Sequence, residues 1–88
     1  MDVIITKQFE KDTEKELSQK MRLRLADIIE ELQKVSKPSE INNIKKLRGF
    51  KSAYRIKMGD YRIGFILEDN LIKLSRIMNR KEIYRYFP

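Results

Sequence analysis

With 88 residues, the chain can build one modest hydrophobic core but not two, so we predict a single domain over residues 1–88. It carries a net charge of +7 and contains neither cysteine nor histidine, which excludes disulfides, thiolate metal sites and an imidazole general base. No apolar run approaches the roughly 18 residues of a membrane span, so we expect a cytoplasmic protein. We expect it to need no metal ion or other cofactor.

The N-terminal half predicts a strand followed by two helices. Val3-Ile4-Ile5-Thr6 is a β-branched run typical of strands, and Thr6 can cap a helix that starts at Lys7. Apolar residues then recur at helical spacing, but a single helix of about 28 residues could not bury two apolar stripes in so small a domain. We therefore predict an αα-hairpin that bends near residues 17–20 and ends at Ser36-Lys37-Pro38-Ser39.

The dipeptide Gly59-Asp60 lies between two alternating runs, residues 53–58 and 61–67, and predicts a β-hairpin with a two-residue primed turn. Such a turn sets the strand register and places the apolar residues on one face. The opposed pairs are Met58–Tyr61, Ile56–Ile63, Tyr54–Phe65, Lys57–Arg62 and Arg55–Gly64. We expect the apolar face to pack on the helices and the basic face to remain open to solvent.

The remaining segments complete an α+β domain. Residues 40–50 predict an irregular connection, and residues 71–78 predict a third antiparallel strand after a turn at Glu68-Asp69-Asn70, which sends Arg76 inward near a sheet edge. Asn79 has capping-box spacing to Glu82 and predicts a short final helix. The order β-α-α-β-β-β-α predicts two layers, an antiparallel sheet of about four strands on the N-terminal αα-hairpin.

The charge is concentrated in the half that holds the hairpin. Residues 1–41 have a net charge of −1 and residues 42–88 a net charge of +8, an asymmetry typical of proteins that bind nucleic acid or another polyanion. Lys57 opposite Arg62 is destabilising, and Gly64 nearby clears space, so we expect an anion, most simply a phosphate, at this place. An ordinary solvated basic strand face is the alternative.

Four segments in the C-terminal half resemble the RelE/ParE superfamily of toxin–antitoxin toxins: Leu47-Arg48-Gly49, Tyr54-Arg55-Ile56-Lys57, Gly59-Asp60-Tyr61-Arg62 and Asn79-Arg80-Lys81-Glu82-Ile83-Tyr84. The resemblance implies a toxin held inactive by a cognate antitoxin. Its RelE branch comprises endonucleases that cleave messenger RNA in the ribosomal A site, and its ParE branch poisons DNA gyrase.

The resemblance also implies roles for individual residues. Lys57 matches the catalytic lysine, Arg62 the phosphate-binding arginine, Arg80 the arginine after the last strand and Tyr84 the tyrosine that stacks on a base; Arg55 matches a second basic residue of some members. Many members have a histidine where this chain has Asn79, so this chain lacks the imidazole base of those members. Apart from the resemblance, a basic loop cluster can bind the backbone of ribosomal or messenger RNA, with ordinary surface charge as the alternative; it comprises Lys45, Lys46, Arg48 and Lys51.

These residues favour cleavage of messenger RNA without a metal ion, by attack of the substrate 2′-hydroxyl on the adjacent phosphate. Two other functions stay open on the sequence alone: a ParE-like inhibitor of gyrase, and a catalytically degenerate member that only binds antitoxin or operator DNA. The expected partners are an acidic antitoxin, messenger RNA and the ribosome.

Overall fold

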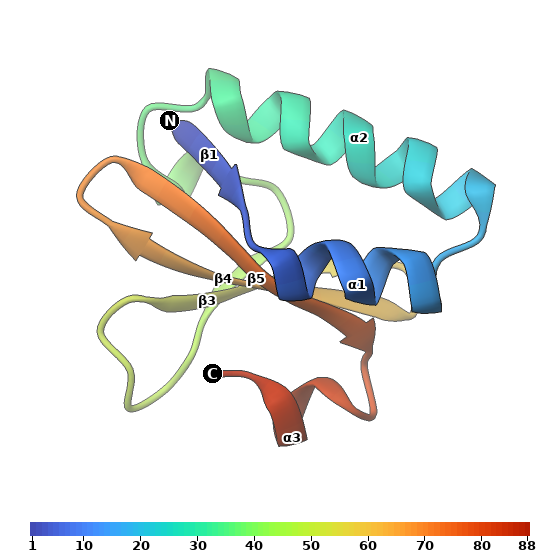
Figure 1. The fold of residues 1–88 in the computed structure, drawn as a ribbon. Coiled ribbons are helices and arrows are strands. Elements are labelled where there is room, and N and C mark those ends of the chain that lie inside the picture. Colours follow the sequence, from blue (N-terminus) through green and yellow to red (C-terminus); the bar gives the residue numbers. More distant parts are fainter.

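The computed structural model describes all residues from 1 to 88 as a five-stranded sheet with helices on both faces (Figure 1). The strands are β1 (Asp2–Ile5), β2 (Ile44–Lys46), β3 (Ala53–Met58), β4 (Tyr61–Glu68) and β5 (Leu71–Asn79), in the spatial order β1-β5-β4-β3-β2. The helices are α1 (Lys7–Glu16), α2 (Gln19–Lys34), a 3₁₀ turn η1 (Pro38–Glu40) and α3 (Ile83–Tyr86). The α+β class is confirmed. No helix is both long and apolar enough to cross a membrane.

The two N-terminal helices form where the sequence predicts them, because each begins at a side-chain cap. Thr6 Oγ accepts a hydrogen bond from Phe9 N at 3.2 Å, and Ser18 Oγ accepts one from Met21 N at 3.3 Å. These caps satisfy amides that the first turn of a helix leaves free. The break between α1 and α2 therefore lies at residues 17–18, inside the predicted bend.

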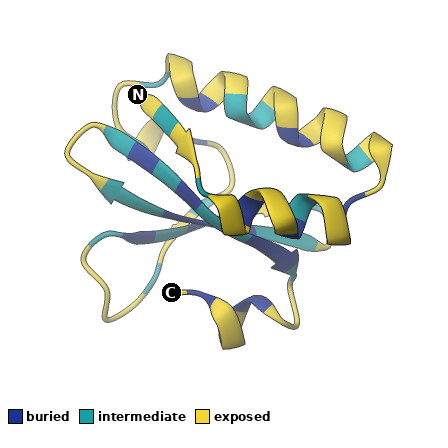
Figure 2. Cartoon of the chain, viewed as in Figure 1, coloured by how far each residue is buried: buried dark blue, intermediate teal, exposed yellow.

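The main core lies between the sheet and the pair α1–α2. One stripe of each helix is buried against the sheet (Figure 2), and the core joins these stripes to one face of β3, β4 and β5. Its fully buried members include Phe9, Leu32, Ile56, Ile63 and Phe65. The predicted hairpin register is confirmed for all five opposed pairs, and Gly59 takes the left-handed φ of 59° that a primed turn needs.

Two features of the sheet differ from the prediction. Residues 44–46, predicted as part of an irregular connection, form the edge strand β2 because they pair with residues 54–56 of β3. Strand β1 pairs in parallel with residues 71–74 of β5, so the sheet is mixed rather than purely antiparallel.

A β-bulge in β5 corrects the predicted position of Arg76. Phe65 pairs with Leu74 and Gly64 with Arg76, so Ser75 has no partner on β4. Side chains along a strand point alternately to the two faces of the sheet, and the extra residue shifts this alternation by one position. Ile77 therefore lies in the main core, and Arg76 lies on the opposite face of the sheet.

The C-terminal segment also departs from the prediction. Strand β5 continues to Asn79, and α3 begins only at Ile83 after a turn, so Asn79 does not cap this helix. Its side chain instead accepts a hydrogen bond from Lys81 N at 2.9 Å, which stabilises the turn. Ile83 and Phe87 form a second, smaller core with Ala53 and Met78 on the sheet face away from α1 and α2.

Asp12 of α1 is a buried carboxylate that closes the edge of β5 beyond the end of β1. It accepts hydrogen bonds from Arg76 Nε at 2.8 Å, Ile77 N at 3.1 Å and Gln8 Nε2 at 3.1 Å. Burial raises the pKa of Asp12, but the hydrogen bonds from Arg76, Gln8 and Ile77 outweigh it and hold the pKa below the ordinary 3.8. The Arg76 guanidinium in turn stacks on Tyr86 of α3, and its carbon lies 5.3 Å from the centroid of the tyrosine ring.

We predict that Asp12→Asn lowers the free energy of unfolding by about 2 kcal/mol at neutral pH, because hydrogen bonds to a buried charge are lost. The carboxylate stabilises the fold above its unfolded pKa, and this stabilisation disappears as the pH falls through the lower folded value. The free energies of unfolding of the wild type and the variant, measured in urea, should therefore differ at neutral pH. This gap should close well below pH 3.8. A gap independent of pH would contradict this account.

Candidate functional site

The sheet face that α1 and α2 leave uncovered carries four cations on three adjacent strands. Lys57 of β3 lies opposite Arg62 of β4, and Lys45 of β2 lies opposite Arg55 of β3. A hollow of about 300 Å³ is lined by these four cations together with Asn43 and Ile44, and we call it the cation hollow. The structure thus brings the two best-placed catalytic candidates, Lys57 and Arg62, to one place.

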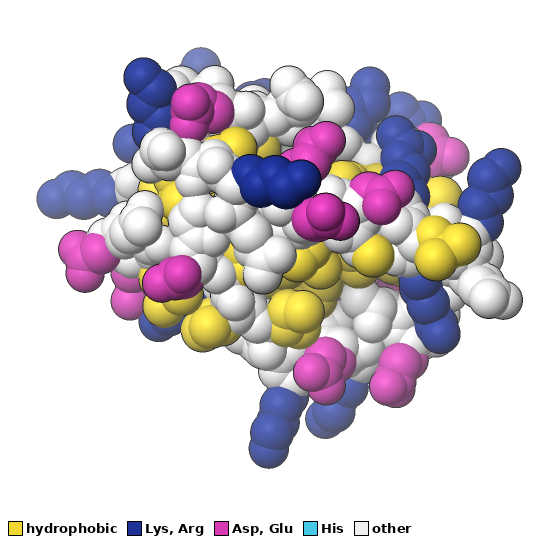
Figure 3. All heavy atoms as spheres, turned by 90° about the horizontal axis from the view of Figure 1, so that it is seen from above, with side chains coloured by type: hydrophobic (Ala, Val, Ile, Leu, Met, Phe, Trp, Pro, Cys, Tyr) yellow, Lys and Arg dark blue, Asp and Glu magenta, His cyan; other side chains and the backbone are white.

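None of the predicted site cations forms an ion pair with a carboxylate. The three ion pairs of the molecule are Lys34–Glu30, Lys73–Glu68 and Arg76–Asp12, all away from the cation hollow. Acidic and basic side chains are instead interspersed on the face that carries the N-terminal helices (Figure 3). The cation hollow therefore concentrates positive charge that a bound anion could neutralise.

Arg62 is held in place by the hairpin turn. Its Nη1 donates to the carbonyl oxygens of Gly59 at 2.8 Å and Tyr61 at 2.9 Å. Arginine has further N–H donors on Nε and Nη2, so this arrangement fixes the guanidinium and leaves those donors for an anion. The turn that sets the register thus also orients a functional candidate.

Arg55 is nearly buried, with 9 % of its surface exposed, and its guanidinium carbon lies 4.6 Å from the ring centroid of Tyr84. The pKa of the exposed Tyr84 hydroxyl is lowered, chiefly because the Arg55 side chain can hydrogen-bond its phenolate. The charges of Arg55, Lys45 and Arg62 add to this effect. Arg55 therefore connects the sheet cations to α3.

A second hollow of about 580 Å³ adjoins the first and shares Lys45 and Arg55 with it; we call it the aromatic hollow. It is lined by Lys45, Lys46, Leu47, Arg48, Phe50, Arg55, Tyr84, Phe87 and Pro88. Phe50 is not among the predicted site residues, although an aromatic side chain within a run of basic residues is a signal of nucleic-acid binding.

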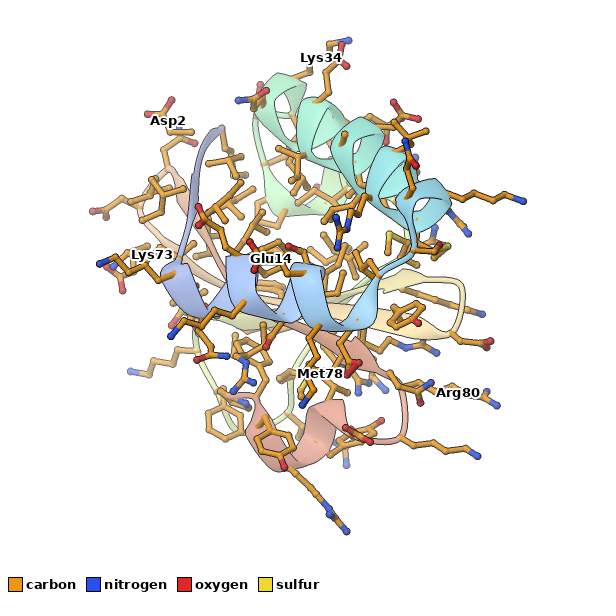
Figure 4. All side chains as sticks on the ribbon, turned by 45° about the vertical axis from the view of Figure 1, so that its right-hand side comes forward. Asp2, Glu14, Lys34, Lys73, Met78 and Arg80 are labelled. Carbon is orange, nitrogen blue, oxygen red and sulfur yellow. The ribbon has the colours of Figure 1, made fainter.

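Two of the predicted site residues line neither hollow. Arg80 projects outward from the segment between β5 and α3 (Figure 4), and its backbone N donates to Asp60 O of the hairpin turn at 2.8 Å. Lys51 lies further along the loop that carries Arg48 and Phe50. Arg80 is thus anchored beside the turn that also holds Arg62, but its head group points into solvent.

The space at Gly64 is not free for an anion, contrary to the prediction from the sequence. A Cβ atom at this position would lie 2.5 Å from Cδ2 of Phe87, because the aromatic ring packs directly on the glycine. The C-terminal segment therefore covers part of the face that the sequence predicts to be open. The cation hollow lies beside this contact and is lined by residues of β2, β3 and β4.

Comparison with known proteins places this geometry in a family context. The family described as "ParE toxin of type II toxin-antitoxin system, parDE" matches residues 3–84. The curated protein Toxin RelE3 of Methanocaldococcus jannaschii is 39 % identical over 89 residues, which covers 100 % of both chains.

Solved structures show the same fold. The toxin-fold chain in the RelB-RelE antitoxin-toxin complex from Methanococcus jannaschii superposes with a TM-score of 0.81 and 38 % identity, covering 97 % of this chain and 99 % of that one. For the archaeal RelE-RelB complex from Pyrococcus horikoshii OT3 the TM-score is 0.74 and the identity 28 %, with coverage of 90 % and 93 %.

The contact between Gly64 and Phe87 leads to a prediction about the C-terminal segment. Gly64→Ala should destabilise the protein by about 1–3 kcal/mol, the usual cost of overpacking, because the new methyl group displaces the ring. The double variant Gly64→Ala/Phe87→Ala should lose less than the sum of the two single variants, since the clash is absent. Urea denaturation of all four proteins measures this coupling, and strict additivity would refute the contact.

Proposed function

The chain belongs to the RelE/ParE superfamily of type II toxin–antitoxin toxins, and from this premise we propose that it is a ribosome-dependent endoribonuclease of the RelE-like branch. One observation carries the proposal: Lys57 and Arg62 lie directly opposite each other in a hollow of four cations that have no carboxylate partner. Such a hollow suits the phosphodiester linkage of a single RNA strand.

In the proposed reaction the 2′-oxygen attacks the adjacent phosphorus while the bond from phosphorus to the 5′-oxygen breaks. Lys57 takes the proton of the 2′-hydroxyl. Arg62 and Arg55 stabilise the charge that grows on the phosphate oxygens, and Arg80, which points into solvent in the free chain, would turn inward to join them when RNA binds. The products are a 2′,3′-cyclic phosphate and a 5′-hydroxyl.

The leaving 5′-oxygen needs a proton, and Tyr84 is the candidate donor within this chain. Its lowered pKa makes it a stronger acid than an ordinary tyrosine. The ribosome could supply this proton instead. Lys45 and Lys46 of β2, with Arg48 and Lys51 of the loop that follows it, would hold neighbouring phosphates and so position the strand.

We further propose a cognate antitoxin as a protein partner. The two solved structures compared above are complexes of RelE with RelB. An acidic antitoxin segment would inhibit this chain by covering the cation hollow or by displacing α3. Phe87, which follows α3, packs on part of the same sheet face.

A second candidate function is inhibition of DNA gyrase, since the matching family is described as ParE toxin. The residue set Lys57, Arg62, Arg80 and Tyr84 favours the nuclease, because an inhibitor that acts by binding alone does not need a base opposite a fixed cation. Expression without antitoxin, followed by mapping of 5′ ends on cellular messages and scoring of gyrase-mediated DNA breaks, separates the two functions.

We predict that Lys57→Ala and Arg62→Ala each reduce RNA cleavage by roughly 10²–10³-fold and abolish growth arrest, because each removes a preorganised group from the transition state. Lys20→Ala removes the same charge from an exposed position on α2 and is the matched control. Cleavage is followed on ribosome-bound messages, and thermal unfolding checks that the variants fold. Full toxicity of both site variants would rule out this site.

We also predict that the purified protein cleaves a message bound in the ribosomal A site much faster than the same free RNA. The exposed hollow does not enclose its substrate, so the ribosome must hold the strand in the geometry for attack. Primer extension on the two substrates at equal toxin concentration provides the comparison. Equal rates would remove ribosome dependence from the proposal while leaving the nuclease activity.

A further inference from the structure

The aromatic hollow lies between the loop that joins β2 to β3 and the C-terminal segment. Both segments lie on the sheet face opposite α1 and α2 (Figure 1). Its volume of about 580 Å³ falls within the range of small-molecule sites, roughly 300–1,000 Å³. It differs from the cation hollow in having aromatic as well as basic side chains in its lining.

Phe50 is presented to this hollow by a tight turn. Phe50 N donates to Leu47 O at 3.3 Å, and Gly49 takes the left-handed φ of 85° that such a turn requires at this position. The ring remains 50 % exposed, whereas Phe9, Phe65 and Phe87 are all buried. The turn thus fixes the backbone that carries Phe50 and leaves its aromatic side chain at the surface.

Tyr84 contributes a second aromatic surface. Its side chain is held against the guanidinium of Arg55, yet 71 % of the residue remains exposed. Arg55 is itself almost fully buried, so it anchors the tyrosine to the sheet. Phe50 and Tyr84 therefore place two aromatic rings in the lining of one hollow.

The basic residues around these rings indicate what the hollow binds. Lys45, Lys46 and Arg48 line it, and it shares Lys45 and Arg55 with the cation hollow that holds Lys57. Aromatic surfaces among cations match a nucleobase flanked by phosphates, because every base has a face that can stack. An acidic peptide would satisfy the cations but would leave the aromatic rings without a stacking partner.

We infer that the aromatic hollow binds one unpaired nucleobase of the RNA, adjacent to the linkage in the cation hollow, with Phe50 as a stacking residue in addition to Tyr84. This inference rests on the proposed nuclease function and extends it. Phe50 would position the strand and would take no part in proton transfer.

The absence of tryptophan from the chain allows a direct test. Phe50→Trp introduces a single tryptophan, which can be excited selectively over the four tyrosines and which a stacked base should quench when a five-nucleotide RNA is added. This RNA carries a 2′-deoxy group at the scissile position so that it is bound without being cleaved. Leu23→Trp, on the exposed side of α2, is the matched control and should show no quenching.

Affinity gives the second measurement. Phe50→Ala should weaken binding of the same oligonucleotide by roughly 5- to 150-fold, whereas Phe50→Tyr, which keeps the ring, should stay within about twofold. The wild type should lose a similar factor when one nucleotide of the oligonucleotide is made abasic. Leu23→Ala, which removes an exposed apolar side chain elsewhere, should leave the affinity unchanged.

The outcomes separate this inference from the proposed function. If RNA is bound and cleaved but the Phe50→Trp variant shows no quenching and Phe50→Ala binds normally, the base site is wrong and the nuclease stands. If no RNA is bound or cleaved, and an acidic antitoxin peptide quenches the fluorescence of the Phe50→Trp variant, both proposals fall and the hollow belongs to the antitoxin interface.

Discussion

The register of the β3–β4 hairpin is the constraint on which the rest of the molecule depends. A two-residue turn at Gly59-Asp60 leaves only one alignment of the two strands, and a slip of one residue would exchange the two faces of the sheet. In this alignment Ile56 and Ile63 face the helices, and Lys57 and Arg62 face away from them. The hydrophobic effect that buries the first pair therefore also forces two like charges to lie opposite each other.

The sheet face that carries the two hollows is shaped by what the C-terminal segment covers and what it leaves open. Phe87 packs on Gly64 and closes the β5 side of this face. Any side chain larger than hydrogen at position 64 would displace the Phe87 ring. The cation hollow stays open beside it, and Arg55 joins this hollow to α3 through its contact with Tyr84. Movement of α3 would consequently alter both hollows, because Tyr84 of this helix contacts Arg55, which lines both of them.

Asp12 shows how a polar residue can be essential to a small fold without a catalytic role. Strand β1 ends after pairing with Leu74, so the amide of Ile77 would otherwise be buried at an edge without a partner. The carboxylate satisfies this amide and pairs with Arg76, which stacks on Tyr86. One side chain thus links the N-terminal helix, the last strand and the C-terminal helix.

The sequence by itself determined the features that depend on neighbouring residues: the cap at Thr6, the break between the helices, and the hairpin register that pairs Lys57 with Arg62. Only the tertiary structure decided the pairing of β2, the bulge at Ser75, and the contacts of Phe87 with Gly64 and of Arg55 with Tyr84. Each of these depends on how segments separated in the chain come together. Their geometry follows from the packing of whole elements, and no local pattern in the sequence encodes it.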